Sequence, residues 1–370
     1  MKIKINQEFK EGLTNYLTSL KTESDFHFLP TKNGVTETGK TLELGFSCLA
    51  LKSFFILGEW QNFSDEKKEN WVNYINSFQN DNVPEFSKNS YIDENYYKNI
   101  IKTDINKEIK RNVKKLLNRG DVKTKKIEIS EYIRAESKQS ISTLAQIGQN
   151  SKSKYEEKIF NSDLEKYLTS LNWNRPWNAG AQYSGLCVFL ETQEKNTKQY
   201  ETIKQELYDF SSLILDTESG FYFKGNIPSE SELINGAMKM ITGFDWLGIP
   251  IHKPEKMIDK SLSIKVSGYG CDLVDIVYVL YKCSEHTYYR RKDILKYFNY
   301  LEGVIANHYF KDEKAFSYNV DSSQIYYYGL KITKGLKTAD LHGTILLLWA
   351  LSMINDLNDE KEINLNIIKP

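Results

Sequence analysis

The chain has 370 residues, of which 40% are hydrophobic and 26% are charged, and its 49 Lys and Arg residues balance 49 Asp and Glu residues. This neutral balance argues against nucleic acid as a partner, because a nucleic-acid-binding protein normally carries a basic excess. The first residues lack the apolar core of a signal peptide, and the longest apolar runs are too short to span a bilayer, so we predict a cytoplasmic protein with no transmembrane segment.

Six segments of the chain are apolar around most of their circumference, and helices of this kind must be covered on most sides. They lie at residues 37–58, 130–148, 177–193, 231–248, 270–284 and 338–354. A more amphipathic segment precedes each of them, and for the second this partner is either NWVNYINSFQ or a charged helix at 105–118. The weak period of about 40–60 residues is typical of an array of helix pairs.

Six such pairs predict an all-α protein with the architecture of an (α/α)6 toroid, six inner helices within six outer ones, in a single domain over residues 1–370. An open helical solenoid is the alternative. The charged, tyrosine-bearing stretch 80–128 does not fit the period and is predicted to be an insertion. In a closed toroid the inner helices run parallel, and their N-terminal ends converge on one face of a central cavity.

Polar residues recur near the N-terminal ends of the predicted inner helices, where a merely packed centre would be apolar, because buried unpaired charge is costly. They are Glu43, Arg134, Glu136, Lys138, Asn178, Gln182, Asn235, Lys239, Asp272, Asp275, Asp340 and His342. Taken singly, Asp272 and Asp340 have an ordinary alternative as helix caps. The agreement of six helix ends favours a shared site.

Asp272 and Asp275 are three residues apart and share a helix face, where two carboxylates repel and the pKa of one rises. With His342 on the neighbouring inner helix, such an acid could protonate an alkene, an epoxide or a glycosidic oxygen. We therefore predict Asp275 (or Asp272) as the acid and His342 as its partner, with Asp340 in the same catalytic set. A structural ion pair between neighbouring helices is the alternative.

No cofactor is predicted, and a divalent metal, zinc or magnesium, is the alternative; Cys271, Asp272 and His342 are ligand types that suit zinc. Predicted substrate contacts come from inner helices, from the tyrosine-rich loop 322–343 and from the sequence YYRRKDI. They are Trp177, Asn178, Gln182, Asn235, Lys239, Tyr278, Arg290, Tyr327, Tyr328, Lys331 and Lys334. Core packing for the aromatic residues and solvated positions for the basic ones are the alternatives. The basic residues suggest a substrate with an anionic group.

Two of the inner segments resemble helices of the terpenoid cyclase and protein prenyltransferase toroid superfamily. CDLVDIVYVLY is similar to the helix that carries a zinc-binding Asp and Cys in prenyltransferase β subunits, and TADLHGTILLLWALSMI is similar to the helix of the ligand histidine. With Asp275 at the Asp position, Val277 stands at the Cys position, and Gly343 stands at the His position. The resemblance implies the toroid fold, and terpenoid cyclisation or prenyl transfer as the reaction.

The leading hypothesis is therefore an enzyme with acid–base chemistry in a central cavity, related to terpenoid cyclases or prenyltransferases. The alternative is a carbohydrate-active enzyme (a polysaccharide lyase, a glycoside hydrolase or a sugar epimerase) acting on an oligosaccharide. A non-catalytic helical scaffold is the third hypothesis. If the protein is a cyclase, we expect a mostly aromatic and apolar pocket with one acid. If it binds sugars, we expect an open cleft with many polar groups, and if it is a scaffold, we expect a filled centre.

Overall fold

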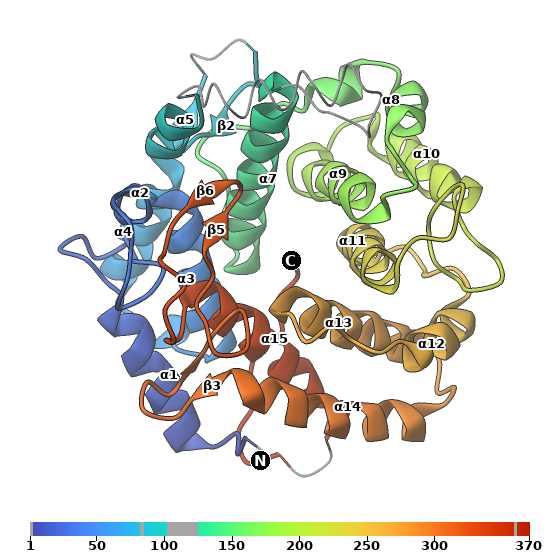
Figure 1. Ribbon diagram of the computed structural model, residues 1–370. Helices are drawn as coiled ribbons and strands as arrows, with labels where there is room; N and C mark the ends of the chain where they lie inside the picture. Colours follow the sequence, from blue (N-terminus) through green and yellow to red (C-terminus); the bar gives the residue numbers. More distant parts are fainter. Residues whose placement is uncertain (1–2, 82–84, 102–124, 359–360) are drawn as a thin grey trace, which may run out of the picture.

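The computed structural model describes residues 3–81, 85–101, 125–358 and 361–370, and its helices form a closed double ring (Figure 1). Consecutive inner helices pack against each other, and the last packs against the first, which closes the ring and rules out an open solenoid. The inner helices are α3 (Leu44–Ile56), α7 (Lys125–Gln146), α9 (Pro176–Phe189), α11 (Glu230–Leu247), α13 (Gly270–His286) and α15 (Leu341–Leu357). The predicted (α/α)6 toroid is confirmed.

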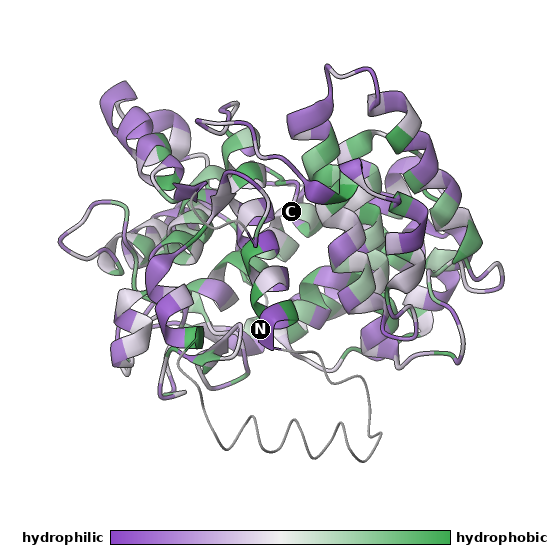
Figure 2. Ribbon diagram, turned by 90° about the horizontal axis from the view of Figure 1, so that it is seen from above, coloured by the Kyte–Doolittle hydropathy of each residue, from purple (hydrophilic) through white to green (hydrophobic). Residues whose placement is uncertain are grey.

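The outer ring consists of helices with one buried face, as their amphipathic sequences predict. They are α1 (Gln7–Ser19), α4 (Asp65–Asn76), α8 (Leu164–Ser170), α10 (Tyr200–Leu213), α12 (Pro254–Ser263) and α14 (Arg291–Ile305). Figure 2 shows hydrophilic residues along their outward turns. Inner helices differ because they are covered on both sides: in α3, 12 of the 13 residues are buried.

Aromatic side chains fill much of the layer between the two rings. The indole of Trp71 on α4 stacks on the ring of Phe28 with a centroid distance of 5.5 Å, and its Nε1 donates to the hydroxyl of Ser47 on α3 over 2.9 Å. Similarly, the Tyr183 hydroxyl of α9 donates to the Leu207 carbonyl of α10 over 2.8 Å. These polar tips find partners inside an otherwise apolar layer, and each fixes an inner helix against an outer one.

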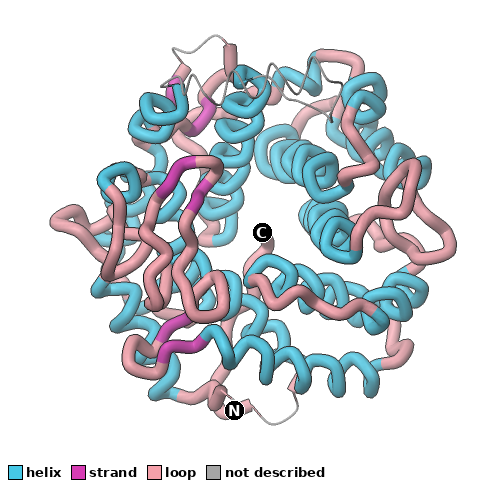
Figure 3. Tube along the Cα trace, in the orientation of Figure 1, coloured by secondary structure: helices cyan, strands magenta, loops and turns pink. Residues whose placement is uncertain are grey.

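Short elements connect the helix pairs. Three antiparallel ribbons join β1 (Gln79–Asn80) to β2 (Ser90–Tyr91), β3 (Tyr309–Phe310) to β4 (Ala315–Phe316) and β5 (Tyr326–Tyr327) to β6 (Leu330–Lys331). Figure 3 shows them as small patches among loops. Within the described ranges, the remaining elements are α2 (Glu37–Thr41), α5 (Glu94–Ile101), the 3₁₀ turns η1 (Trp60–Asn62), η2 (Lys158–Asn161) and η4 (Ala306–His308), and the π-helical turn η3 (Leu190–Glu194).

Most of the predicted insertion 80–128 lies outside the described residues, namely 82–84 and 102–124, as does the alternative helix at 105–118. The described part of this stretch contacts the inner ring at the start of α3. The Asp93 carboxylate accepts hydrogen bonds from the backbone N–H groups of Glu43 and Leu44 at the start of α3, over 2.7 and 3.2 Å. Residues 125–128 already belong to the inner helix α7, so the stretch that departs from the helix-pair pattern is shorter than predicted.

The two faces of the ring are covered by different segments. On the face of the N-terminal helix ends, the β5–β6 hairpin reaches α7 through a 2.7 Å hydrogen bond from the Tyr327 hydroxyl to Glu136. On the opposite face, the segment 365–370 binds the C-terminal helix ends: Asn366 donates its N–H to the Ile56 carbonyl of α3 and Trp246 of α11 donates to the Pro370 carbonyl, over 2.8 and 3.0 Å.

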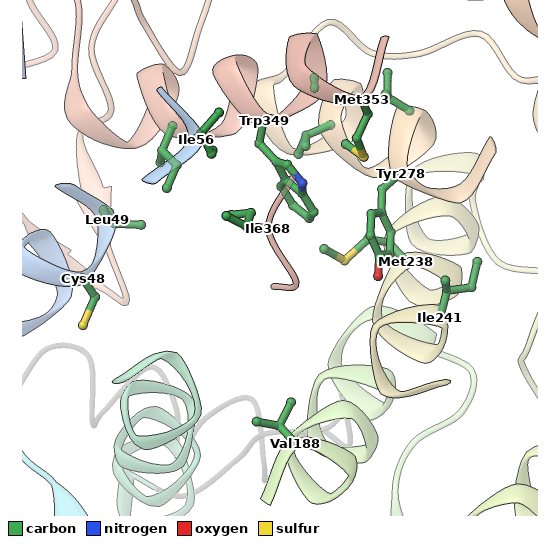
Figure 4. Close-up of a cluster of buried hydrophobic side chains, with 14 of the residues drawn as sticks. Cys48, Leu49, Ile56, Val188, Met238, Ile241, Tyr278, Trp349, Met353 and Ile368 are labelled. Atoms are coloured by element: carbon green, nitrogen blue, oxygen red, sulfur yellow. The ribbon is translucent and has the colours of Figure 1, made fainter. Parts of the chain in front are cut away.

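Ile368 of this segment is only 3% exposed and lies among apolar side chains from five inner helices (Figure 4). These include Leu49, Val188, Met238, Tyr278 and Trp349. This apolar layer, together with the segment 365–370, forms the floor of the ring. Within the described residues, no helix is both long enough and apolar enough to cross a bilayer.

Candidate functional site

Charged side chains from several inner helices meet in the centre of the ring, on the N-terminal side of the apolar floor. Lys239 lies midway along α11, which packs mainly against α9 and α13. The pKa values of Lys52 on α3, Lys138 on α7 and His342 on α15 are all lowered, mainly by burial and in addition by the positive charge of Lys239. Because none of these three helices is a main packing partner of α11, the groups approach one another through the centre of the ring.

Water reaches this region even though the inner helices are covered on both sides. Lys138, Lys239, Cys271, His342 and Leu346 all remain partly exposed on inner helices. Leu346 lies one turn beyond His342 on α15, so the accessible region extends along the helix from its N-terminal end. These partly exposed residues show that water reaches the centre of the ring at this level, and this water-accessible region, most of whose groups are polar, is called the hollow below.

Asp275 is the carboxylate of the predicted pair that faces the hollow. It is 4% exposed and makes no hydrogen bond to the described residues. Burial raises its pKa to about 7, with opposing contributions from Lys239, whose charge lowers the pKa, and Asp272, whose charge raises it. Near neutral pH, Asp275 therefore retains a proton that an ordinary aspartate has already released, and it can donate this proton.

Asp272 has a different role, because its oxygens are already hydrogen-bonded. Ser231 and Asn235 of α11 donate to Oδ1 over 2.9 and 2.8 Å, and the Ser267 hydroxyl donates to Oδ2. These bonds join α11 to the start of α13. Asp272 and Asn235, both predicted as site residues, thus position the helices around the hollow, and Asp275 remains available for chemistry.

His342 lies at the mouth of the hollow in the first turn of α15. Its Nδ1 is 2.9 Å from the Gln324 amide oxygen, and its ring stacks on Tyr318 at a centroid distance of 5.4 Å. Burial and the charge of Lys239 lower its pKa to about 4, so the imidazole is neutral at pH 7. With Nδ1–H donating to Gln324, Nε2 bears the lone pair, and it makes no hydrogen bond to the described residues. His342 is therefore arranged to accept a proton.

Asp340, the third acid of the predicted catalytic set, caps α15 and anchors a loop. Its Oδ1 accepts the Gly343 N–H over 2.7 Å, and its Oδ2 accepts the N–H groups of Tyr318 and Gln324 over 2.7 and 3.0 Å. Burial raises its pKa to about 6, against the opposing effect of these hydrogen bonds. Because Tyr318 and Gln324 both contact His342, Asp340 positions the partners of the histidine instead of facing the hollow.

Gly343 occupies the position at which the resemblance to prenyltransferases would place a ligand histidine. A Cβ atom there would lie 2.1 Å from the Tyr318 nitrogen and 2.2 Å from the Ser317 carbonyl carbon. No side chain fits at such distances, so a histidine is sterically excluded. Among the described residues, no group of three His, Cys, Asp or Glu side chains is arranged to hold a metal ion. Of the proposed ligands, Asp272 is bound by Ser and Asn side chains, and Cys271 accepts from the Tyr318 hydroxyl at 3.1 Å.

Glu136 is a second buried acid, which the sequence pattern includes among the helix-end residues but does not single out. It is 1% exposed, and its Oε1 accepts the Tyr327 hydroxyl over 2.7 Å. The Tyr132 hydroxyl is close enough to lower its pKa, but Oε2 lacks a hydrogen bond of good geometry. Burial, with a smaller contribution from the charge of Asp93, raises the pKa of Glu136 to about 8, so it is protonated at neutral pH.

Several predicted substrate contacts lie away from the hollow. Arg290 begins the outer helix α14, where it pairs with Asp259 and Asp293 over 2.8 and 2.7 Å. Lys331 and Lys334 are exposed at the β5–β6 hairpin, and neither alters the pKa of Asp275 or His342. The basic groups at the centre are instead lysines of the inner helices, because a hairpin at the ring face directs its long polar side chains outward to water.

The remaining predicted contacts are divided between the surface, the floor and a buried network. Trp177 (38% exposed) and Asn178 lie at the exposed start of α9. Tyr278 packs in the apolar floor, 5.2 Å from the Trp349 ring. Tyr328 is exposed at the hairpin turn, whereas Tyr327 is buried against Glu136. Gln182 accepts a 2.9 Å hydrogen bond from Arg134, which also pairs with Glu157.

Comparisons with known proteins give one structural neighbour. The GH76A α-1,6-mannanase from Salegentibacter sp. HEL1_6 superposes with a TM-score of 0.45 and 11% sequence identity, covering 95% of this chain and 99% of the mannanase. No protein-family model matches the sequence, and neither does any curated protein. The resemblance to terpenoid cyclases and prenyltransferases thus finds no support beyond the toroid fold itself.

Proposed function

We propose that the chain is a carbohydrate-active enzyme that performs acid–base catalysis in the hollow of the toroid. Asp275 supplies the proton, and the neutral imidazole of His342 accepts one through Nε2. The two groups belong to neighbouring inner helices, and both respond to the charge of Lys239. An acid with a pKa near 7 can donate a proton at neutral pH, and a neutral imidazole has a lone pair that can accept one.

The observation that carries this proposal is the polar character of the accessible groups. Lys138, Lys239, Cys271 and His342 are partly exposed to the hollow, and Asp275 makes no hydrogen bond with any residue that the structure describes. Covering such groups with a hydrocarbon would remove their water without replacing its hydrogen bonds, at a cost of about 1–3 kcal/mol for each group. Sugar hydroxyls replace those bonds, so an oligosaccharide fits this lining.

Terpenoid cyclisation or prenyl transfer is the second candidate, and one feature favours it. The apolar floor contains Met238, Tyr278 and Trp349 (Figure 4), and Tyr278 follows Asp275 by three residues on α13, so the floor begins about one helical turn from this acid. A hydrocarbon chain directed towards that floor would place its alkene near a carboxylic acid. The floor residues are buried and packed around Ile368, however, so this substrate needs a rearrangement of the floor that an oligosaccharide does not.

A turnover screen tests the proposal. The protein is incubated with neutral and acidic oligosaccharides, and with prenyl diphosphates in parallel, and products are detected by mass spectrometry. We expect turnover of a carbohydrate, lowered about 100- to 10,000-fold in both Asp275→Asn and His342→Ala. Asp209→Asn, on the exposed face of the outer helix α10, is the matched control.

The melting temperature separates chemistry from folding. Each variant should melt within a few degrees of the native chain, because Asp275 makes no hydrogen bond to the described residues and the partly exposed His342 loses only one hydrogen bond to Gln324 and the stacking on Tyr318. Turnover of prenyl diphosphates alone would replace the proposal with the second candidate. Full activity of both variants would overturn the assignment of Asp275 and His342, and a collapse in stability would indicate structural roles for them.

A further inference from the structure

Three lysines on different inner helices point into the hollow next to the proposed catalytic pair. They are Lys52 of α3, Lys138 of α7 and Lys239 of α11. Lys52 is 6% exposed, and the other two are half-buried. A lysine in the middle of an inner helix is unusual, because the neighbouring positions of these helices are apolar and covered.

The contacts of these lysines place them at one level of the ring. The ammonium of Lys52 donates to the Ser142 hydroxyl over 3.0 Å, and Ser142 lies four residues after Lys138 on the same face of α7. The stem of Lys239 passes Gly180 of α9, where an added Cβ would lie 3.0 Å from the Lys239 Cβ. Because α9 stands between α7 and α11, the Lys239 side chain extends from there towards Lys138.

None of the three lysines forms an ion pair with a carboxylate of the described residues. Elsewhere the fold pairs its buried cations closely: Arg134 contacts Glu157 at 2.9 Å, and Lys282 contacts Asp245 at 3.0 Å. In the hollow, Lys52 has only a neutral hydroxyl partner, and Lys138 and Lys239 have no hydrogen bond within the described chain. The hollow thus contains three lysine side chains and lacks the carboxylate partners that the rest of the described structure provides for its buried basic groups.

The electrostatic consequences agree with this arrangement. Burial, with the positive charge of Lys239, lowers the pKa of Lys52 to about 8 and that of Lys138 well below its usual value. The charge of Lys239 acts on the Asp275 carboxylate, but burial keeps this acid partly protonated at neutral pH. Clustered cations of this kind are costly unless an external anion completes the site.

We propose that Lys52, Lys138 and Lys239 form a binding site for an oxyanion, namely a phosphate, sulfate or carboxylate group. The three ammonium groups approach it from three sides of the ring, and the Ser142 hydroxyl lies beside them. The anion is either a free ion or an acidic group of the substrate bound next to Asp275 and His342. The site is independent of the reaction class, because it is defined by charge and geometry alone.

Calorimetric titration with inorganic phosphate and sulfate, at constant ionic strength maintained with chloride, tests the site. We expect saturable binding with one site per chain, at least tenfold weaker in Lys138→Met and in Lys239→Met. Lys331→Met and Lys334→Met, which remove exposed lysines, are the matched controls and should bind as the native chain does. Methionine retains the length and the apolar stem of lysine, so the variants should fold, and their melting temperatures without anion should not fall.

Proton uptake gives a second readout. At pH 8 the anion should draw protons onto the lysines, so the heat of binding should depend on the ionisation enthalpy of the buffer, and this dependence should decrease in Lys138→Met. The other titratable groups that interact with the charges of these lysines are Cys48 on α3, Cys187 on α9, Cys271 and Asp275 on α13, and His342 on α15. Glu136 lies two residues before Lys138 on α7 and interacts with Tyr327, Asp93 and Tyr132 instead.

A third titrant distinguishes the two sources of the anion. If an acidic oligosaccharide binds through the lysines and inorganic phosphate does not, the anion is a substrate group. If neither binds, or if Lys138→Met and Lys239→Met bind both as tightly as the native chain, the site does not exist. Turnover of neutral sugars without any anion binding would refute this site and leave the proposed function intact. Anion binding without turnover of any carbohydrate, neutral or acidic, would refute only the function.

Discussion

Replacing Glu136 with glutamine should remove a pH-dependent penalty that the native fold carries. Burial, with a smaller contribution from Asp93, raises the pKa of Glu136 from 4.5 to about 8. Between these pH values the unfolded chain has released the proton and the folded chain retains it, so the free energy of unfolding falls as the pH rises. At about 1.36 kcal/mol per pKa unit, the loss amounts to about 5 kcal/mol by pH 9.

Urea unfolding followed by tryptophan fluorescence, between pH 5 and pH 9, measures this penalty. Glutamine has the shape of glutamate and can still accept the Tyr327 hydroxyl through its amide oxygen. We expect Glu136→Gln to match the native chain near pH 5 within about 1 kcal/mol and to exceed its stability by about 5 kcal/mol near pH 9. Other groups titrate in both proteins, so their effects cancel in the difference.

Glu206→Gln, on the exposed face of α10, controls for the general effect of removing an acid. The stability difference between this variant and the native chain should not change with pH. If the difference for Glu136→Gln is equally flat, the Glu136 carboxyl titrates alike in the folded and unfolded chains, and the reasoning from burial is refuted.

Three further predictions concern the helix ends. Asp275→Asn should remove the limb of the pH–rate profile near pH 7 that reports the proton donor, measured on any substrate that the native chain turns over. Asp340→Ala should lower the free energy of unfolding by about 3 kcal/mol, because one helix cap and two loop hydrogen bonds are lost. The same variant should make the loop 318–340 easier for proteases to cleave, and unchanged cleavage would contradict the anchoring role of Asp340. Gly343→Ala should lower the free energy of unfolding, measured in urea, by at least about 3 kcal/mol. The control is Gly303→Ala on α14, where an added Cβ meets no atom within 4 Å, and this variant should be as stable as the native chain or more stable. Equal effects of the two substitutions would contradict the close packing at Gly343.

The toroid could be predicted from the sequence because its physical requirement is local. Segments such as CLALKSFFILG and GTILLLWALSMI are apolar all round, and a helix of this kind has to be covered on both sides. The placement of polar residues at the N-terminal ends followed from the same pattern. The segment 365–370 has no periodic pattern, and its role in closing the floor appears only in three dimensions.

The roles of individual acids could not be predicted, because their partners are distant in sequence. Asp272 and Asp275 are equivalent by spacing, and only the contacts from Ser231 and Asn235 distinguish them. Asp340 likewise depends on the backbone of Tyr318 and Gln324. Hydrogen bonds between residues that are distant in sequence can be identified only in the three-dimensional structure.

The central lysines did leave a signal in the sequence. Lys52 interrupts an otherwise apolar helix, and it could have been singled out by the cost of burying an isolated charge. Attention to the lysine-rich hairpin instead favoured Lys331 and Lys334, which are exposed. An interruption of an apolar run was thus the better indicator of the central cations than a cluster in a loop.

The convergence of side chains in one hollow can be tested most directly by measuring the pKa of His342. An NMR titration of the protein with ¹³C-labelled histidine, assigned with His342→Ala, should give a value of about 4 in the native chain. In Lys239→Met the value should rise, because a positive charge from α11 no longer opposes protonation of a ring on α15. A His342 pKa near 6.5, or one that Lys239→Met leaves unchanged, would show that the two side chains do not share the centre of the ring.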